Sequence, residues 1–558
     1  MAEKYMMIDN IRCPFTDERN VLEVARNNGI DIPSLCYCES LSIYKACRLC
    51  IVEDANGQIV TSCSLIPEEG MEVYTNTPAV QKNRRIILEL LLGSHRIECT
   101  TCEKSGTCKL LEYSNRYRAQ APRTGNLYST LPIDDSSPCI VRDPSKCVLC
   151  GQCVRMCEEI QGIKALQFYH RGSHSYVGPV NNKLMAETNC VGCGQCSAVC
   201  PTGAIMPHSY VREFWEMIHS RTKVVVQVAP AVRVGIGEAF GLPTGEPVMG
   251  KIVTALKRMG VDVVYDTNMS ADLTIMEEAK EFLDRLQNGG VLPMFTSCCP
   301  GWIQHAEHKH PKLLPNISTC GSPMEMMGAC IRQQFKGERV YSVAIMPCTA
   351  KKFECRREQL EKDGQPLVDL VITTQELARM IRESNIDFVN LPDTECDNPL
   401  GEYSGGGVIF GVTGGVTEAV IRHVLHAASP DALQQIAECG VRGLEGTKIF
   451  EVTAGDLTLR IAVVSGLKNT DNLIAKIRSG AVKVDFVEVM ACANGCINGG
   501  GQPQAPHASK IKRSKGLFKA DSECEFKYAE QNPAMEYVYS ELLDGRAHDL
   551  LHVKYVKD

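Results

Sequence analysis

The cysteines of this chain are gathered into short groups, and this grouping constrains the fold more than any other feature. There are 29 cysteines in 558 residues, and long intervals between the groups hold few of them. Cysteines that served only as small apolar side chains would be scattered. Disulfide frameworks belong to oxidising compartments, whereas closely spaced thiols in a long chain indicate metal ligands. We therefore expect much of the chain to be folded around metal.

The length, charge and hydropathy of the chain set the remaining limits. A chain of 558 residues predicts three or four domains. A net charge of -7 with both signs interspersed gives no basic surface for nucleic acid. The apolar runs at 86–92 and 224–228 are far shorter than a membrane span, and the first ten residues, MAEKYMMIDN, lack a basic start and an apolar run. We expect a cytoplasmic protein that binds neither membranes nor nucleic acid.

Residues 1–80 predict a small sheet with one helix, and they carry the first cysteine group. Apolar residues at 21–25 give a helix stopped at Gly29, and Asn56-Gly57 predicts a hairpin. The gaps of ten, two and twelve residues in this group resemble those of 2Fe-2S ferredoxin domains, with a zinc site as the alternative. The expected ligands are Cys36, Cys47, Cys50 and Cys63.

A histidine precedes the second group, after the apolar run at 86–92. The set is His95, Cys99, Cys102 and Cys108. One imidazole and three thiolates can hold zinc, but directly after a 2Fe-2S domain the set resembles the histidine-ligated 4Fe-4S site of FeFe hydrogenases and of the large iron-sulfur subunit of NADH dehydrogenase. A nitrogen ligand donates less charge than a thiolate, so we expect a different potential for this cluster.

The third group repeats one spacing twice, with gaps of two, two and three residues. This repeat resembles the two-cluster bacterial ferredoxins, in which the fourth cysteine of each run ligates the other cluster. One 4Fe-4S cluster would then have the ligands Cys147, Cys150, Cys153 and Cys200, and the other Cys190, Cys193, Cys196 and Cys157. Such a crowded N-terminal region predicts a chain of electron carriers.

After residue 207 the dense spacing stops, and alternating apolar strands and amphipathic helices predict a large α/β domain. Three of its segments combine cysteine with glycine, proline or lysine: TSCCPGW (296–302), MPCTAKKFE (346–354) and EVMACANGCINGGGQP (488–503). Together they resemble the three signatures of FeFe hydrogenases, and the order of the preceding modules extends the resemblance over essentially the whole chain. The expected activity is the reversible reaction 2H+ + 2e- = H2.

The resemblance implies a ligand set for the catalytic H-cluster, which is a 4Fe-4S cluster linked to a two-iron subsite with CO, CN and dithiomethylamine ligands. The ligands would be Cys299, Cys348, Cys492 and Cys496, with Cys496 bridging the two parts. Gly495 and the glycines at 499–501 would let the backbone approach the cluster. With the N-terminal groups, the total is one 2Fe-2S and three accessory 4Fe-4S clusters.

The resemblance also implies a proton relay that begins at the thiol of Cys298. Glu278 and Glu281 stand three residues apart in TIMEEAKEF (274–282), so a helix would project both from one face. With Ser318 and Arg285 they match the relay of the family. On periodicity alone, a solvated acidic helix face is the alternative.

Further residues implied by the resemblance surround the subsite. Lys351 would donate to a cyanide ligand, and the shielding residues would be Met346, Met490, Ala229 and Pro230. The segment STCGSPM (318–324) departs from the family pattern at Gly321 and Met324. Nine cysteines, including Cys13, Cys139, Cys320 and Cys355, have no expected ligand role.

The expected fold class is multidomain α+β and α/β, with ferredoxin-like modules before a large catalytic domain. The expected units are 1–80 (2Fe-2S), 81–130 (His/Cys3 4Fe-4S), 131–210 (two 4Fe-4S) and 211–558 (catalytic). Electrons would be relayed to ferredoxin, or to a flavin- or NAD(P)-binding partner subunit in an NAD(P)-linked or bifurcating complex. No GxGxxG fingerprint is present, so any nucleotide chemistry would belong to the partner. Less favoured functions are an iron-sulfur electron-transfer subunit, which would not need the three signatures, and a non-catalytic assembly factor or hydrogen sensor.

Overall fold

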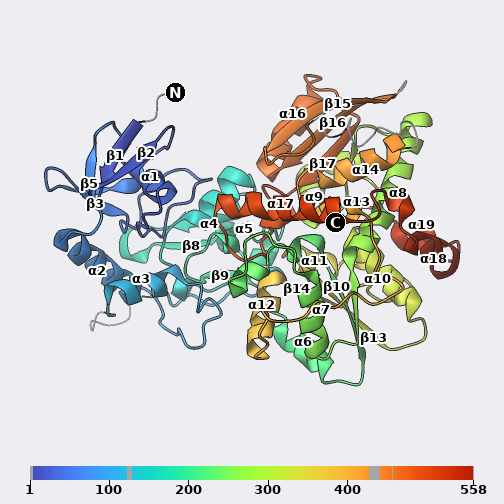
Figure 1. Ribbon diagram of the computed structural model, residues 1–558, viewed down its shortest axis with the longest axis horizontal. Helices are drawn as coiled ribbons and strands as arrows, with labels where there is room; N and C mark the ends of the chain where they lie inside the picture. Colours follow the sequence, from blue (N-terminus) through green and yellow to red (C-terminus); the bar gives the residue numbers. More distant parts are fainter. Residues whose placement is uncertain (1–3, 122–127, 427–435, 437–439, 455–456, 557–558) are drawn as a thin grey trace.

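The computed structural model describes residues 4–121, 128–426, 436, 440–454 and 457–556. Figure 1 shows the N-terminal modules at one end of the molecule and the elements from α6 (Val211–Ile218) onwards at the other. Helix α17 (His507–Glu523) lies across the catalytic part and points toward the N-terminal modules.

The first module is a five-stranded sheet with one helix packed on it. Helix α1 (Val21–Asn27) begins at Asn20, whose side chain accepts from the Glu23 amide, and Gly29 follows it with φ 75°. The hairpin predicted at Asn56-Gly57 is confirmed. The strand order is β2-β1-β5-β3-β4, with β1 (Lys4–Ile8), β2 (Ile11–Phe15), β3 (Ile51–Asp54), β4 (Ile59–Thr61) and β5 (Glu72–Tyr74).

Short elements follow, and they have little apolar interior of their own. Helices α2 (Pro78–Gly93) and α3 (Lys109–Tyr117) pack through Leu88 and Leu110. The next module contains the strand pairs β6 (Ile140–Arg142) with β9 (Ile205–Pro207) and β7 (Leu166–Tyr169) with β8 (Tyr176–Pro179), and the helices α4 (Gln152–Arg155) and α5 (Gln195–Ala198). Cysteines make up much of its buried cluster, as expected of a module that folds around metal.

The catalytic domain contains two four-stranded sheets. The first, in the order β11-β10-β13-β14, is fully parallel and comprises β10 (Lys223–Val228), β11 (Val263–Asp266), β13 (Val340–Met346) and β14 (Leu370–Thr373). The second, in the order β12-β17-β16-β15, comprises β12 (Met294–Phe295), β15 (Thr447–Ala454), β16 (Leu457–Ser465) and β17 (Phe486–Met490). Only the β15–β16 pair is antiparallel in it. The apolar strands are buried because helices pack against the sheets, and the predicted α/β class is confirmed.

Helices surround these sheets and position the site. They include α7 (Met249–Arg258), α8 (Thr267–Gln287), α9 (Pro300–Lys309), α10 (Pro323–Gln334), α12 (Thr374–Glu383), α14 (Gly415–His426) and α16 (Leu467–Arg478). After α19 (Ala547–Leu551), the C-terminal segment pairs with residues 319–321 through Gly321 N to Leu551 O (2.7 Å) and Val553 N to Thr319 O (2.7 Å). Within the described residues, no helix has the length and apolar character needed to span a bilayer.

Candidate active site and electron-transfer sites

The four thiols of the first module lie side by side and are buried. The Cys47 amide donates to Cys36 Sγ (3.5 Å), and the Leu35 amide donates to Cys47 Sγ (3.3 Å). A hydrogen bond from Cys47 lowers the pKa of Cys36, and one from Cys63 lowers the pKa of Cys50. The same two hydrogen bonds raise the pKa of the donors Cys47 and Cys63, so each pair holds one proton between two sulfurs. Four sulfurs this close, with amides directed at two of them, suit a shared iron cluster.

His95 is held in the tautomer that a metal ligand needs. Its Nδ1 lies 3.1 Å from the Lys146 carbonyl, which can only accept, so Nδ1 carries the proton and Nε2 keeps its lone pair. Burial lowers the pKa of His95 and so favours the neutral ring. Cys108 directly precedes α3, and its pKa is raised by burial and by its neighbours Cys102 and Cys99.

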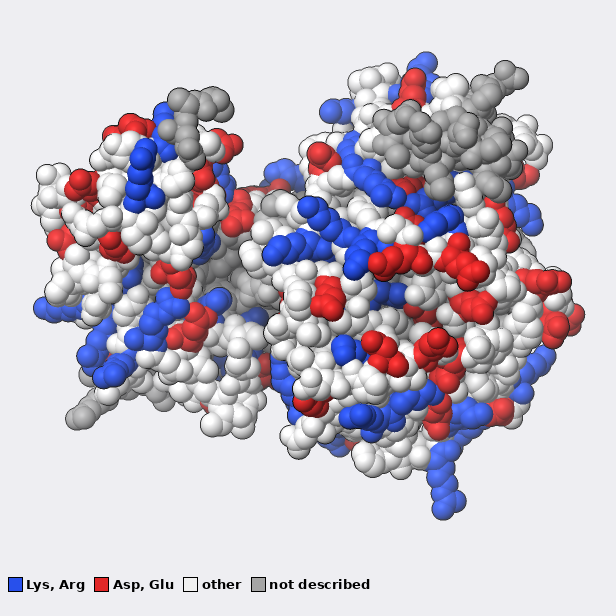
Figure 2. All heavy atoms as spheres, viewed as in Figure 1, with Lys and Arg blue, Asp and Glu red and all other residues white. Residues whose placement is uncertain are grey.

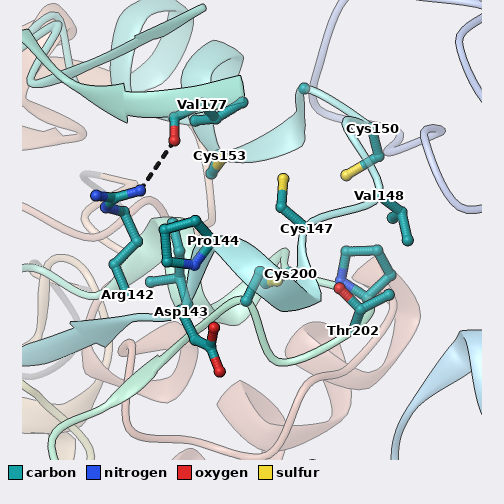
Figure 3. Close-up of a pocket in the computed structure, with 14 residues that line it drawn as sticks. Arg142, Asp143, Pro144, Cys147, Val148, Cys150, Cys153, Val177, Cys200 and Thr202 are labelled. Atoms are coloured by element: carbon teal, nitrogen blue, oxygen red, sulfur yellow. Dashed lines mark hydrogen bonds between the residues drawn. The ribbon is translucent and has the colours of Figure 1, made fainter. Parts of the chain in front are cut away.

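Each of two cavities in the next module is lined by four cysteines. The first cavity contains Cys147, Cys150, Cys153 and Cys200 (Figure 3), and the second contains Cys157, Cys190, Cys193 and Cys196. Each set takes three cysteines from one run and the fourth from the other, which is the crossed arrangement that the sequence predicts. Gly151 (φ 69°) and Gly194 (φ 67°) follow the second cysteine of each run and turn the chain into α4 and α5.

In the catalytic domain, the sequence segments of interest all follow the carboxyl ends of strands. These are 229–230 after β10, 296–299 after β12, 347–351 after β13 and 491–496 after β17. Strands β10 and β13 are parallel neighbours in one sheet, and β12 and β17 in the other. Because the carboxyl ends of parallel strands meet at one edge of a sheet, this is where α/β folds place ligands.

Hydrogen bonds join the three cysteine segments directly. The Ala491 amide donates to Cys299 Sγ (3.3 Å), and the Gly501 amide donates to the Pro347 carbonyl (2.9 Å). Lys351 Nζ donates to the Cys298 carbonyl (3.3 Å). Segments that are distant along the chain therefore enclose one space.

The four thiols expected to bind the H-cluster are mutual neighbours in this space, namely Cys299, Cys348, Cys492 and Cys496. Burial raises the pKa of each, and for Cys348, Cys492 and Cys496 the charges of the other thiols raise it further. Without a cation the set resists ionisation, whereas iron ions supply the positive charge that stabilises thiolates. The donor set therefore fits a four-iron cluster.

The glycines of the third segment pack tightly against other parts of the protein. A Cβ on Gly499 would lie 2.1 Å from the Pro347 carbonyl oxygen, and one on Gly500 would lie 2.5 Å from that of Cys193. Gly495 has φ 85°, and its Cβ would lie 2.6 Å from the Thr413 amide. A side chain at any of these three positions would therefore collide with protein backbone, and the close approach of the glycines to a cluster stays a prediction.

The expected relay residues form a connected group on α8 and beside it. The Ser318 hydroxyl donates to Glu281 Oε2 (3.0 Å), and Arg285 donates to Glu281 Oε1 (2.5 Å). Glu278 is fully buried, and its pKa is raised to about 8 by burial first and then by the charge of Glu281, with Ser318 acting in the opposite direction. Burial, and next the charge of Glu278, raise the pKa of Cys298 well above its usual range.

Lys351 pairs with Glu354 (2.6 Å), and both side chains are nearly buried. Glu325, which no sequence motif singles out, is 2 % exposed, and its pKa is raised to about 8 by burial and by Glu354. Glu325 lies in the first turn of α10, three residues after the N-cap residue Ser322. A glutamate at this place in a sequence is typical of an ordinary helix cap, so the sequence gives no signal of another role.

The four expected shielding residues are all buried: Met346, Met490, Ala229 and Pro230. Met490 packs in one apolar cluster with Cys298 and Cys496, and Ala229 and Met346 pack in the cluster of the first sheet.

The cysteine sites follow one another through direct contacts between modules. Arg155 NH2 donates to the Cys36 carbonyl (2.8 Å), which joins the first module to α4, and the Arg96 amide donates to the Ser145 carbonyl (2.9 Å). At the other end, Thr349 Oγ1 donates to the Gly192 carbonyl (2.7 Å). The thiol of Cys193 is close enough to Cys492 to raise its pKa. The cysteine groups therefore form a continuous series that ends at the thiols around Cys492.

Comparisons with known proteins match all parts of the chain. The family profile described as "Iron only hydrogenase large subunit, C-terminal domain" matches residues 222–500, and "Iron hydrogenase small subunit" matches 508–558. Towards the N-terminus the matches are "2Fe-2S iron-sulfur cluster binding domain" (5–78), "NADH-ubiquinone oxidoreductase-G iron-sulfur binding region" (84–123) and "NADH-quinone oxidoreductase subunit 3, ferredoxin-like domain" (137–206).

Individual relatives cover the whole chain. It is 40 % identical to "NADP-reducing hydrogenase subunit HndD" of Solidesulfovibrio fructosivorans, over 100 % of this chain and 99 % of that protein. It is 37 % identical to "Iron hydrogenase 1" of Clostridium pasteurianum, over 99 % and 100 %. A solved structure of FeFe-hydrogenase HydA1 from Chlamydomonas reinhardtii superposes with a TM-score of 0.54 at 35 % identity, covering 62 % of this chain and 99 % of that one.

A series of cysteine groups that leads to four neighbouring thiols at the strand ends of an α/β domain defines an iron-sulfur oxidoreductase. Matches at high coverage specify it further: the chain belongs to the iron-only, or FeFe, hydrogenase family. It is a hydrogenase with an H-cluster and iron-sulfur electron carriers, and the resemblance seen in the sequence is confirmed. The catalytic-domain match decides against a simple electron-transfer subunit.

Proposed function

We propose that Cys299, Cys348, Cys492 and Cys496 hold the four-iron part of the H-cluster and that Cys496 bridges to the two-iron subsite with its CO, CN and dithiomethylamine ligands. When bound, this group supplies the redox chemistry that interconverts two protons and two electrons with H2. One observation carries the proposal: four thiols from three strand ends, one buried and three half-buried, lie so close together that their charges raise the pKa of Cys348, Cys492 and Cys496.

For the accessory clusters we propose the ligand sets that the sequence predicts, namely one 2Fe-2S cluster in the first module, one 4Fe-4S cluster on His95 and its three cysteines, and two 4Fe-4S clusters in the ferredoxin-like module. The thiol neighbours of the first module and the two cysteine-lined cavities support the first and the last of these. Two branches of the electron path meet at the site of Cys147. The hydrogen bond of Arg155 connects the 2Fe-2S module to this site, and the hydrogen bond of the Arg96 amide connects the His95 site to it. Electrons then pass through the site of Cys193 to the catalytic thiols.

The relay moves protons between the buried site and solvent. Cys298 passes a proton to Glu278, and the Ser318 hydroxyl connects Glu278 with Glu281. Arg285, 12 % exposed, holds Glu281 at the outer end. A carboxyl with a pKa of about 8 both holds and releases a proton near neutral pH, as a relay requires.

Two groups of side chains complete the site in this proposal. Lys351, oriented by Glu354 and the Cys298 carbonyl, supplies a fixed positive charge for a cyanide ligand. Met490, Met346, Ala229 and Pro230 exclude water from the site.

We also propose that the chain is divided into the units 1–80, 81–130, 131–210 and 211–558.

For the electron partner, we propose ferredoxin or a flavin- or NAD(P)-binding subunit, and a cytoplasmic location. The similarity to HndD, which is named as a subunit of an NADP-reducing hydrogenase, supports a partner subunit. Figure 2 shows acidic and basic side chains interspersed over the visible face, which agrees with a protein partner better than with nucleic acid. Reduction of NADP+ by H2 that requires a co-purified subunit would favour the complex, and direct ferredoxin reduction would favour the self-sufficient enzyme.

Infrared spectroscopy of matured protein tests the ligand assignment. The wild-type enzyme should show CO and CN bands together with hydrogen evolution. In Cys348→Ser, the H-cluster bands should be lost or shifted while the accessory iron remains. Wild-type bands and rates in this variant, or in the equivalent variant of Cys492, would refute the assigned set. The Cys330→Ser variant changes a buried cysteine with no expected ligand role and serves as the control.

A further inference from the structure

Three side chains outside the hydrogen-activating site converge on one point. His305 lies in α9, His310 directly follows this helix, and Asp471 lies in α16. His305 Nε2 and His310 Nε2 each lie 2.8 Å from the same oxygen, Asp471 Oδ1. One potential ligand atom from each residue lies within 4.8 Å of the other two.

The cluster is shielded from water and suitably oriented. The side chains of His305, His310 and Asp471 are 2 %, 7 % and 18 % exposed. The two rings meet edge to face at 74°, with centroids 5.5 Å apart, so their Nε2 atoms converge while the rings do not stack. Burial lowers the pKa of His305 and keeps it in the neutral form that binds metal.

We propose that His305, His310 and Asp471 form a binding site for a divalent transition metal ion of the zinc class. Two imidazole nitrogens and one carboxylate oxygen are a common three-residue set for such ions, and they leave coordination positions for water. When the ion binds, each ring must carry its proton on Nδ1 and present the Nε2 lone pair, so metal–ligand bonds replace the two hydrogen bonds from Nε2 to Asp471 Oδ1. Nδ1 of His310 has no hydrogen-bond partner among the described residues, so a proton there displaces no other bond.

A neighbouring lysine competes with a metal ion for Asp471, and this competition gives the proposal a second test. Lys309 Nζ pairs with the other oxygen of Asp471 (2.6 Å), and its side chain is 49 % exposed. The exposed stem allows this side chain to swing into solvent when a cation binds. Removal of the Lys309 charge therefore separates two roles of the cluster. If the cluster is only an ion-pair network, this change weakens it; if the cluster binds a metal ion, this change increases the affinity for the ion.

The site lies between two parts of the electron path. Helix α9 begins immediately after Cys299. On the other side, a Cβ on Gly162 would lie 3.5 Å from Asp471 Oδ2, and the adjacent Gln161 lines the cavity of Cys157 and Cys193. A bound ion would therefore join α9 to α16 beside the loop of the last accessory site.

The test uses holoenzyme with its iron-sulfur clusters, treated with EDTA and then equilibrated with Zn2+ alone. Bound zinc is measured by metal analysis, and its ligands by X-ray absorption. The wild-type chain should hold one zinc that His305→Gln/His310→Gln lacks and that His308→Gln, a change of an exposed histidine on the same helix, retains. The ligand shell should lie at about 2.0–2.1 Å without sulfur at about 2.3 Å.

The Lys309→Met variant should bind zinc about fivefold more tightly, because an exposed competing ion pair has been removed. Equal zinc in the wild-type and double-histidine chains would overturn the proposal, as would a sulfur shell, which places the ion on cysteines. Unchanged or weaker binding in Lys309→Met would also count against it. Iron content checks each variant, and Asp471→Asn carries the same test should the double variant lose its clusters.

Discussion

The Ser318 hydroxyl donates a 3.0 Å hydrogen bond to Glu281, which joins the segment after η9 (Pro311–Asn316) to the outer part of α8. Ser318 also lies close enough to the buried Glu278 to lower its pKa, and neither carboxyl oxygen of Glu278 has a hydrogen-bond partner among the described residues. Ser318 is therefore the hydroxyl that acts on both carboxyl groups, and in the proposed relay the proton passes through it.

We therefore expect Ser318→Ala to reduce hydrogen evolution by roughly 10²-fold or more, the range of a lost proton-transfer step. The clusters should assemble normally, because Ser318 is not a ligand. Hydrogen evolution from reduced methyl viologen, measured beside iron content, checks this. Ser220→Ala, an exposed serine in a turn, is the control. A rate within about twofold of wild type would exclude Ser318 from the path.

Cys298→Ser should nearly abolish turnover while the infrared bands of the bound CO and CN remain. A serine hydroxyl releases its proton far less readily than a thiol, so only the proton step is cut. Cys298 is adjacent to Cys299, but only Cys299 is proposed as an iron ligand. Serine at these two positions should therefore have different effects on the infrared bands. Cys299→Ser should disturb the bands themselves. Wild-type turnover in Cys298→Ser would remove this thiol from the relay.

The pH profile of hydrogen evolution should show the titration of Glu278. Its pKa is raised to about 8, so the carboxyl is protonated below this pH and charged above it. The rate should therefore decline as the pH rises through 8, by about tenfold per unit beyond it. In Glu278→Gln, the residual rate should be low and should lack this step. Rates measured from pH 6 to 9 at fixed driving force distinguish the two profiles, and identical profiles would contradict the assignment.

The sequence could predict which cysteines of the ferredoxin-like module lie together because most of their spacing is local. Two-residue gaps force neighbouring thiols together, and the pairing of Glu281 with Arg285 follows from helical periodicity. The cluster of His305, His310 and Asp471 could not be predicted, since Asp471 stands 161 residues after His310 and belongs to no motif. The same holds for Gly500 against Cys193, because only tertiary packing brings these residues together.

The buried ion pair of Arg233 and Asp266 supports the strand end that carries Pro230. Arg233 NH2 lies 2.7 and 2.8 Å from the two carboxylate oxygens, and Arg233 Nε donates to the Pro230 carbonyl (3.2 Å). Arg233→Met should destabilise the protein by about 3–5 kcal/mol, because it leaves an unpaired buried charge. Arg233→Met/Asp266→Leu should recover part of this loss. Thermal unfolding of the holoenzyme should give the highest melting temperature for the wild type, an intermediate one for the double variant and the lowest for Arg233→Met. Equal melting temperatures for the wild type and Arg233→Met would contradict the prediction.

Gly500 controls the distance between the last accessory site and the catalytic thiols. A Cβ there would lie 2.5 Å from the Cys193 carbonyl oxygen and 2.7 Å from Gly194 Cα, so Gly500→Ala must separate the two segments at a cost of about 1–3 kcal/mol. Electron transfer between the sites weakens as they separate, whereas exchange between H2 and D2O needs no net electron transfer. We expect reduction of benzyl viologen by H2 to fall several-fold in Gly500→Ala while isotope exchange remains near the wild-type rate. A parallel loss of both activities would indicate a damaged catalytic site, and unchanged dye reduction would show that this contact does not limit the electron path.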